Sequence, residues 1–335
     1  MRVGRARSRI LIAAAVVWPF WSGFGGQGGA GVQQPVGTTF RTSSELVALN
    51  VTVTDNSNQH VRGLAKEDFA VFEDGVPQEI VFFAASAVPL DLVIMLDTSS
   101  SMSDKLSLVQ EAAAGLLGVL RPGDVAEVVG FSENAVILQP FTSDRRALED
   151  AIRATSATGS TSLHNALYIV LQELRRMSRG RERDIADVRR QAVVVLSDGN
   201  DTASLISFED VLESVKRSGV AVYPISIMSG WEAEQARAFW QNRSYSESAY
   251  ALKAIARESG ALSFFPKVLA ELGFIYKQIA SELSMQYSIG YPPRNPGTDG
   301  SFRRIIVRLV NHPNARPRTR SGYYAASAAS AWNRK

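Results

Sequence analysis

Three oxygen-bearing side chains follow one another at intervals of two residues where an apolar run ends. The run extends from Leu90 to Leu96, and Asp97, Ser99 and Ser101 come directly after it. In extended backbone, residues two apart point to the same side, so the carboxylate and the two hydroxyls would converge on one point of an exposed loop. Hard cations such as Mg²⁺ take oxygen ligands, and side chains rarely complete the near-octahedral set by themselves. The spacing therefore predicts a metal site rather than a catalytic one.

Two further oxygen donors occur at comparable places later in the chain. Thr161 lies in the Gly-Ser-Thr-Ser-Leu segment 159–163, at the start of a helical pattern, and Asp198 follows the apolar run 193–196. In open α/β sheets, ligands bind beyond the carboxyl ends of the strands. Since Asp97 and Asp198 both follow apolar strands, we expect them at that edge of the sheet.

These three segments, DxSxS, GxTSL and an apolar strand ending in SDG, resemble the von Willebrand factor A (VWFA) family in order and approximate spacing. The family carries a metal-ion-dependent adhesion site (MIDAS), and the resemblance implies that its five contributors here are Asp97, Ser99, Ser101, Thr161 and Asp198. It also implies that the serines and either Thr161 or Asp198 contact the metal directly, while the remaining carboxylate acts through water. The expected ion is Mg²⁺, with Mn²⁺ or Ca²⁺ as alternatives.

The same resemblance implies a function in protein binding. Neutral hydroxyl ligands leave the cation electrophilic, so its last coordination position attracts an acidic group. We therefore expect a protein partner that offers an Asp or Glu carboxylate. One alternative is a structural or assembly component of the cell envelope, in which the metal only ties three loops together. A second alternative is that the serines cap the next helix, because Asp and Ser after a strand often do so.

The residue inventory disfavours an enzyme. The histidines are confined to positions 60, 164 and 312, and no Gly-x-Ser-x-Gly elbow accompanies them. A serine hydrolase needs a base beside its nucleophile, and His164 is the one histidine close to the predicted site in sequence. Neither a Gly-x-Gly-x-x-Gly fingerprint nor a P-loop occurs, which argues against the usual nucleotide sites of doubly wound sheets.

The first thirty residues predict export. Four arginines precede the apolar run 10–21, and a stretch of small residues follows at 22–30, as in a signal peptide. The alternative, an uncleaved membrane anchor, requires a span of roughly twenty apolar residues. Without residues 1–30 the formal net charge falls from +3 to −1, which removes the main electrostatic support for nucleic-acid binding. The chain has no cysteine, so it has no disulfides. We expect a secreted or periplasmic, cell-envelope protein.

The middle of the chain predicts a doubly wound α/β domain with a mostly parallel sheet, over residues 88–283. Apolar strands at 90–96, 125–131, 192–196 and 220–227 alternate with helical patterns at 104–120, 144–155, 162–177 and 207–217. The segment 229–248 is longer than an ordinary α/β connection. It reads either as a local helix on the sheet edge or as a ligand-recognition loop.

Both ends of the chain show strand patterns instead. Alternating hydrophobic residues mark an N-terminal β unit at 40–87, after a linker at 31–39, and strands recur at 284–326, before a tail at 327–335. A lone two-stranded hairpin is marginal in water. We therefore expect the terminal strands to pair with the N-terminal ones in a small antiparallel β-sandwich. This layout resembles secreted acidobacterial proteins of the VWFA family.

Overall fold

The computed structural model describes residues 46–326 except 86–87, 182–188, 228–243, 267, 296 and 298. The predicted signal peptide, linker and tail lie outside these ranges, as do residues 40–45 and most of the 229–248 segment. Residues 244–248 of that segment begin a helix, α6 (Ser244–Ser259). Within the described ranges, the helices are too short or too polar to cross a bilayer.

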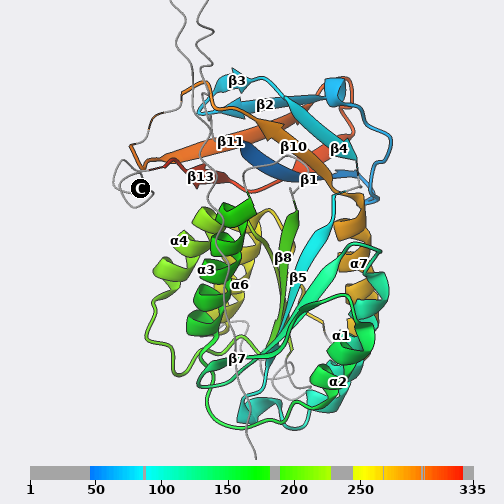
Figure 1. Cartoon of the computed structure of the whole chain (residues 1–335), viewed down its shortest axis with the longest axis vertical. Helices are drawn as coiled ribbons and strands as arrows, with labels where there is room; N and C mark the ends of the chain where they lie inside the picture. Colours follow the sequence, from blue (N-terminus) through cyan, green and yellow to red (C-terminus); the bar gives the residue numbers. More distant parts are fainter. Residues whose placement is uncertain are drawn as a thin grey trace, which may run out of the picture. The chain divides into compact units, whose positions relative to one another are not determined.

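A five-stranded sheet forms the centre of the larger domain (Figure 1). Its order is β7-β6-β5-β8-β9, and all neighbours are parallel except β7, which runs antiparallel at one edge. Strands buried on both faces read as continuous apolar runs, which is why they were visible in the sequence. The strands are β5 (Leu90–Asp97), β6 (Val125–Phe131), β7 (Ala135–Thr142), β8 (Arg190–Ser197) and β9 (Ala221–Ser226).

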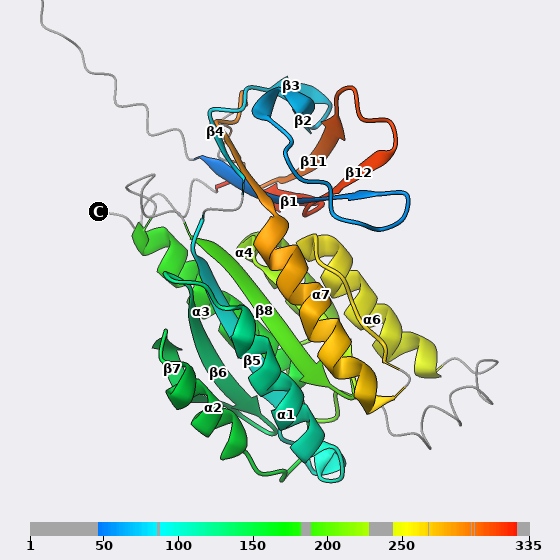
Figure 2. The ribbon, with the colours of Figure 1, turned by 90° about the vertical axis from the view of Figure 1, so that its right-hand side faces the viewer.

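Helices cover both faces of this sheet, so the prediction of a doubly wound fold is confirmed (Figure 2). One face packs against α1 (Leu106–Leu116), α2 (Arg145–Arg153) and α7 (Leu272–Met285). The other packs against α3 (Leu163–Arg181), α4 (Phe208–Ser218) and α6. Short 3₁₀ turns lie at η1 (Lys66–Asp68), η2 (Ser100–Met102), η3 (Leu117–Val119) and η5 (Leu269–Glu271).

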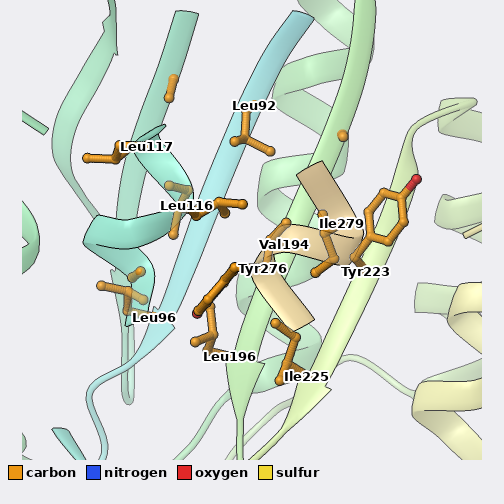
Figure 3. Packing of buried hydrophobic residues seen from close by; sticks show 14 of the residues in the cluster. Leu92, Leu96, Leu116, Leu117, Val194, Leu196, Tyr223, Ile225, Tyr276 and Ile279 are labelled. Atoms are coloured by element: carbon orange, nitrogen blue, oxygen red, sulfur yellow. The ribbon is translucent and has the colours of Figure 1, made fainter. Parts of the chain in front are cut away.

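The two-residue period of a strand divides β5 between these two cores. Leu92 and Leu96 belong to the cluster with α1 and α7, which also holds Tyr223 and Ile279 (Figure 3). Val93, one residue from Leu92, belongs to the cluster under α3 and α4. Both faces of β5 are buried, so packing fixes the position of the strand. The position of its last residue, Asp97, is fixed with it.

The two chain ends build a small antiparallel β-sandwich, as predicted. In one sheet β1 (Val47–Asp55) lies between β10 (Tyr287–Tyr291) and β12 (Ala315–Arg318), and β10 also pairs with β4 (Phe82–Ala85). In the other, the order is β13-β11-β2-β3. Its strands are β2 (Phe69–Glu73), β3 (Val76–Gln78), β11 (Phe302–Leu309) and β13 (Gly322–Tyr324). N- and C-terminal strands therefore share both sheets.

A buried polar network joins the sandwich to the α/β domain. Glu282 of α7 is 2% exposed, accepts a hydrogen bond from the Tyr223 hydroxyl at 2.8 Å and pairs with Arg318 of β12 at 2.7 Å. Gln286, the residue between α7 and β10, donates to the same hydroxyl at 3.1 Å. A buried carboxylate requires such partners, because its desolvation is otherwise uncompensated.

We predict that Arg318→Met lowers the free energy of unfolding by about 2–3 kcal/mol, because Glu282 keeps its buried charge and loses its cation. Chemical denaturation followed by circular dichroism measures the change. Arg316→Met is the matched control, since Arg316 lies on the same strand with its side chain exposed. Equal stability of the two variants would contradict the role of the Glu282 network.

Candidate metal centre

Asp97 and Asp198 lie at the ends of neighbouring parallel strands. Asp97 is the last residue of β5, and Asp198 follows β8, which pairs with β5 so that Leu96 stands opposite Leu196. The Ser197 hydroxyl crosses between the strands and donates to Asp97 Oδ2 at 2.6 Å. Asp97 is 0% exposed and Asp198 6%. The sheet register therefore places two buried carboxylates side by side.

The chain after β5 bends so that its alternate residues gather. Asp97 Oδ1 accepts a hydrogen bond from the Ser99 backbone N–H at 2.9 Å, and Ser99 Oγ lies 3.0 Å from Ser101 Oγ. Thr98 instead turns toward β6, where its hydroxyl donates to the Phe131 carbonyl at 3.0 Å. The alternation expected from the sequence is present. Ser99 is buried, however, against the expectation of an exposed loop, and only Ser101 of the pair is exposed.

The capping alternative is wrong for these serines. Ser99 precedes η2 without a side-chain capping bond, and α1 begins later, after Lys105, also without one. The two hydroxyls contact each other instead of backbone N–H groups. They are therefore available as ligands.

Thr161 lies in a loop that is hydrogen-bonded to the loop after β5 and to the loop after β8. The Thr158 backbone N–H donates to the Thr98 carbonyl at 2.7 Å, and the Ser100 N–H donates to the Gly159 carbonyl at 2.9 Å. These bonds join the 158–161 segment to the serine loop. The Thr161 side chain is nearly buried, and in the described part of the chain its hydroxyl has no hydrogen bond.

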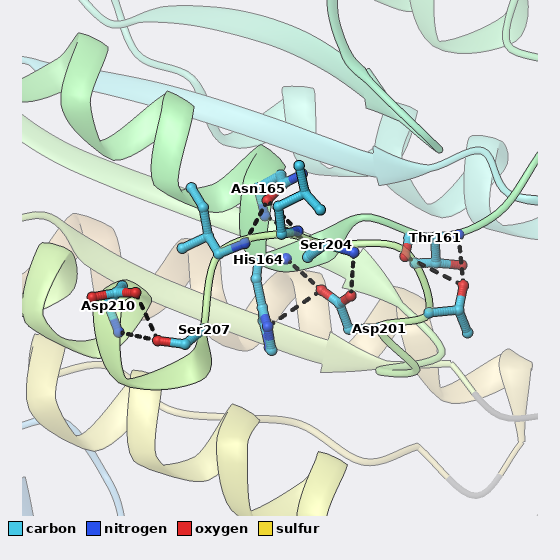
Figure 4. A network of polar contacts seen from close by, with 10 residues as sticks. Thr161, His164, Asn165, Asp201, Ser204, Ser207 and Asp210 are labelled. Carbon is cyan, nitrogen blue, oxygen red and sulfur yellow. Dashed lines mark hydrogen bonds and ion pairs between the residues drawn. The ribbon is translucent and has the colours of Figure 1, made fainter.

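The loop after Asp198 is joined to the other side of Thr161, at the start of α3 (Figure 4). The Thr161 carbonyl accepts from the Thr202 N–H at 2.9 Å, and the Thr161 N–H donates to the Thr202 hydroxyl at 3.1 Å. Asp201 Oδ2 accepts from the His164 N–H at 2.7 Å, and Asn165 Oδ1 accepts from two backbone N–H groups of the 205–206 segment. All three loops thus form one hydrogen-bonded rim.

Asp97 and Asp198 lack a counter-charge among the described residues. Asp198 Oδ1 accepts from the Asn200 N–H at 3.0 Å, but the buried Asp198 Oδ2 has no hydrogen-bond partner in the described chain. Burial raises the pKa of Asp97, and the negative charge of Asp198 adds to this. No ion pair reaches either group within the described ranges. Two close anions, one with an unsatisfied oxygen, fit a bound cation.

The donor set also fits the expected chemistry. In the described part of the chain no three His, Cys, Asp or Glu side chains gather as a metal cluster, which argues against a site made of imidazoles or carboxylates alone. The residues that the structure brings together are instead two carboxylates and two hydroxyls, with the Thr161 loop bonded beside them. Such hard oxygen donors suit Mg²⁺, Mn²⁺ or Ca²⁺.

Sequence reasoning did not identify the residues that hold this site in place. Ser197 orients Asp97, and Asp201 and Asn165 join the third loop to α3. Ser197 was visible as the first letter of the SDG segment, but its partner lies 100 residues away in sequence. Asp201 and Asn165 carry no local signal, because the segments they connect come together only in the fold.

Comparison with known proteins identifies related sequences. The model of the von Willebrand factor type A domain family matches residues 91–270. Among curated relatives, inter-alpha-trypsin inhibitor heavy chain H1 of Sus scrofa is 26% identical over 141 residues, which cover 40% of this chain and 15% of the relative. Heavy chain H4 of Bos taurus is 20% identical over 213 residues, covering 62% of this chain and 22% of the relative. The chain thus spans less than a quarter of these relatives.

Solved structures give a similar but weaker likeness. A von Willebrand factor type A protein from Catenulispora acidiphila has a TM-score of 0.46 and 13% identity, covering 87% of this chain and 76% of that one. Proximal thread matrix protein 1 from the mussel byssus, with a zinc-occupied MIDAS motif, has a TM-score of 0.44 and 16% identity, covering 63% and 49%. Since both TM-scores are low, the family assignment rests on the sequence match.

We predict that Ser99→Ala combined with Ser101→Ala weakens Mg²⁺ binding by at least about tenfold, because two neutral oxygen ligands are removed. Titration calorimetry measures the affinity. Ser100→Ala is the matched control, since Ser100 lies between them with an exposed side chain and should bind as the wild type does. Unchanged affinity in the double variant would contradict the assignment.

We predict that Asp198→Asn raises the melting temperature in the presence of chelator and lowers it, relative to wild type, in Mg²⁺. Neutralising one of two close carboxylates relieves repulsion on the order of 1 kcal/mol in the metal-free protein. The wild type gains stability from a bound ion that the variant binds less well. Thermal denaturation in both buffers tests this, and a variant that is less stable in chelator would refute it.

Proposed function

The chain belongs to the von Willebrand factor type A family, whose domains commonly act as MIDAS-dependent protein-interaction modules, and from this premise we propose that it is a secreted, non-enzymatic adhesion module. Its partner is a protein that presents an Asp or Glu carboxylate. The observation that carries the proposal is the buried, unsatisfied Asp198 Oδ2 beside Asp97 and the paired serine hydroxyls.

The chemistry assigned to each residue follows from its surroundings. Ser99 and Ser101 supply neutral ligands, and Thr161 or Asp198 supplies a third. Asp97 is held by the Ser197 hydroxyl and the Ser99 N–H, so it acts as a fixed negative charge at the base of the site. When bound, Mg²⁺ would supply an electrophilic centre that attracts an exogenous carboxylate. The exposure of Ser101 leaves one side of the rim open to a partner.

Hydrogen bonding in the rim favours adhesion over a purely structural metal. The three loops are already joined by backbone and side-chain bonds, from Thr158 to Thr98 and from Thr202 to Thr161. The protein's own hydrogen bonds therefore hold the loops together, and the contribution proposed for a cation is to neutralise the carboxylates and to bind an incoming ligand. An envelope assembly component with a structural metal remains the second candidate.

The geometry around the hydroxyls also supports a role other than hydrolysis. Ser99 and Ser101 contact each other, whereas His164 Nδ1 lies 3.4 Å from Asp201 Oδ2, and its backbone N–H is bonded to the same oxygen. The described polar contacts of His164, at the start of α3, therefore lead to Asp201 and not to a serine hydroxyl. Location in the secreted or periplasmic, cell-envelope fraction is part of the proposal and rests on the signal peptide predicted from the sequence of residues 1–30.

We predict that a partner from the cell-envelope or secreted fraction is retained by the immobilised protein in Mg²⁺ and released by chelator. The Ser99→Ala, Ser101→Ala double variant should retain none, while Ser100→Ala should retain as much as the wild type. Quantitative mass spectrometry of the retained proteins measures this. Retention that is the same in chelator and in the double variant would contradict adhesion and would favour the assembly role.

A further inference from the structure

A cavity of about 610 Å³ lies between the edge of the sheet and helix α3. β6, β7 and α3 form its walls, and most of the lining is apolar, with Val129, Ala135, Ile137 and Ile169 among its residues. Cavities of this size and composition are typical of sites for small organic molecules. Ile137 and Ile169 are more than half exposed, so large apolar side chains meet water at this cavity.

One of the carboxyl groups that line this cavity, Glu127, is buried without a partner among the described residues. Glu127 is 7% exposed and lies two residues before Val129, on the same face of β6. Within the described ranges it has no hydrogen bond or ion pair. Burial raises its pKa to about 7, and the nearby charge of Glu173 adds to the effect. A buried carboxylate without a partner is costly, and a cation would remove that cost.

Among the charged groups that line the cavity, Glu127 is the one for which the described chain provides no counter-ion. Glu173 pairs with Arg176 at 2.8 Å, and this pair lies on the exposed side of α3. Arg175 also lines the cavity and has interactions of its own. The residues of β7 that line the cavity are uncharged. Glu127 is therefore a buried carboxyl group without a partner in the described chain, in a mostly apolar lining that also includes Tyr168, Glu173, Arg175 and Arg176.

We propose that this cavity binds a small amphipathic cation, an ammonium or guanidinium group carried on an apolar chain or ring. The cationic head lies against the Glu127 carboxylate, and the apolar part lies against Val129, Ile137 and Ile169. The cavity is separate from the metal centre. Glu127 stands opposite Val93 on β5, four residues before Asp97, a distance of about 13 Å along the strand.

Titration with 4-phenylbutylamine in chelator tests the proposal without involving the metal centre. We expect saturable binding to the wild type and at least about tenfold weaker binding to Glu127→Gln, because a charge-assisted hydrogen bond is lost. Glu111→Gln, on the exposed side of α1, is the matched control and should bind as the wild type does. The neutral analogue 4-phenylbutanol should bind at least severalfold more weakly than the amine.

The pH dependence provides an independent measure. Because the pKa of Glu127 is about 7, its carboxylate forms as the pH rises through neutrality, while the amine stays protonated. Affinity should therefore increase from pH 6 to pH 8 in the wild type and stay flat in Glu127→Gln. Equal affinity of the two proteins, equal affinity for the amine and the alcohol, or absence of saturable binding would overturn the proposal.

Discussion

The placement of two carboxylates at the ends of neighbouring buried strands is the constraint on which the rest of the site depends. Parallel pairing of β5 with β8 brings Asp97 next to Ser197 and Asp198, and all three residues are buried. The Ser197 hydroxyl and the Ser99 N–H each satisfy one Asp97 oxygen, but neither carries charge. Burying like charges in this way is unfavourable unless a cation accompanies them.

Hydrogen bonds within the protein organise the surrounding loops. Thr161 is held between the serine loop and the loop after β8 by hydrogen bonds on both sides, and Asp201 fixes the start of α3. Preorganised ligands lose little conformational freedom on binding. A bound metal would then act in binding a partner, since the fold itself supplies the rigidity that a structural ion would otherwise provide. The β-sandwich, joined through Glu282 and Arg318, stabilises the same domain through α7.

The sequence predicted those parts of the structure that follow from local periodicity. The apolar run at Leu90–Leu96 indicated a central strand, and the two-residue spacing of the site correctly gathered Asp97, Ser99 and Ser101. Two edge strands, β7 and β12, were missed, whereas the edge strand β9 was predicted. β7 is mostly exposed and gives no clear alternation, and β12, with the sequence Ala-Arg-Pro-Arg, offers almost no apolar signal. β7 pairs with β6, the strand just before it, with Val129 opposite Ile137. β12 pairs with β1, with Val53 opposite Pro317, so its partner lies far away in the sequence.

In the proposed metal centre, the oxygen atoms of Ser99, Ser101 and either Thr161 or Asp198 share one cation beside Asp97. A crystal of the protein soaked in Mn²⁺ tests it most directly, because the ion can be located by its anomalous scattering. The account predicts a single strong peak at about 2.0–2.3 Å from the two serine hydroxyls. A peak at another place on the protein, with the two serine hydroxyls still contacting only each other, would contradict it.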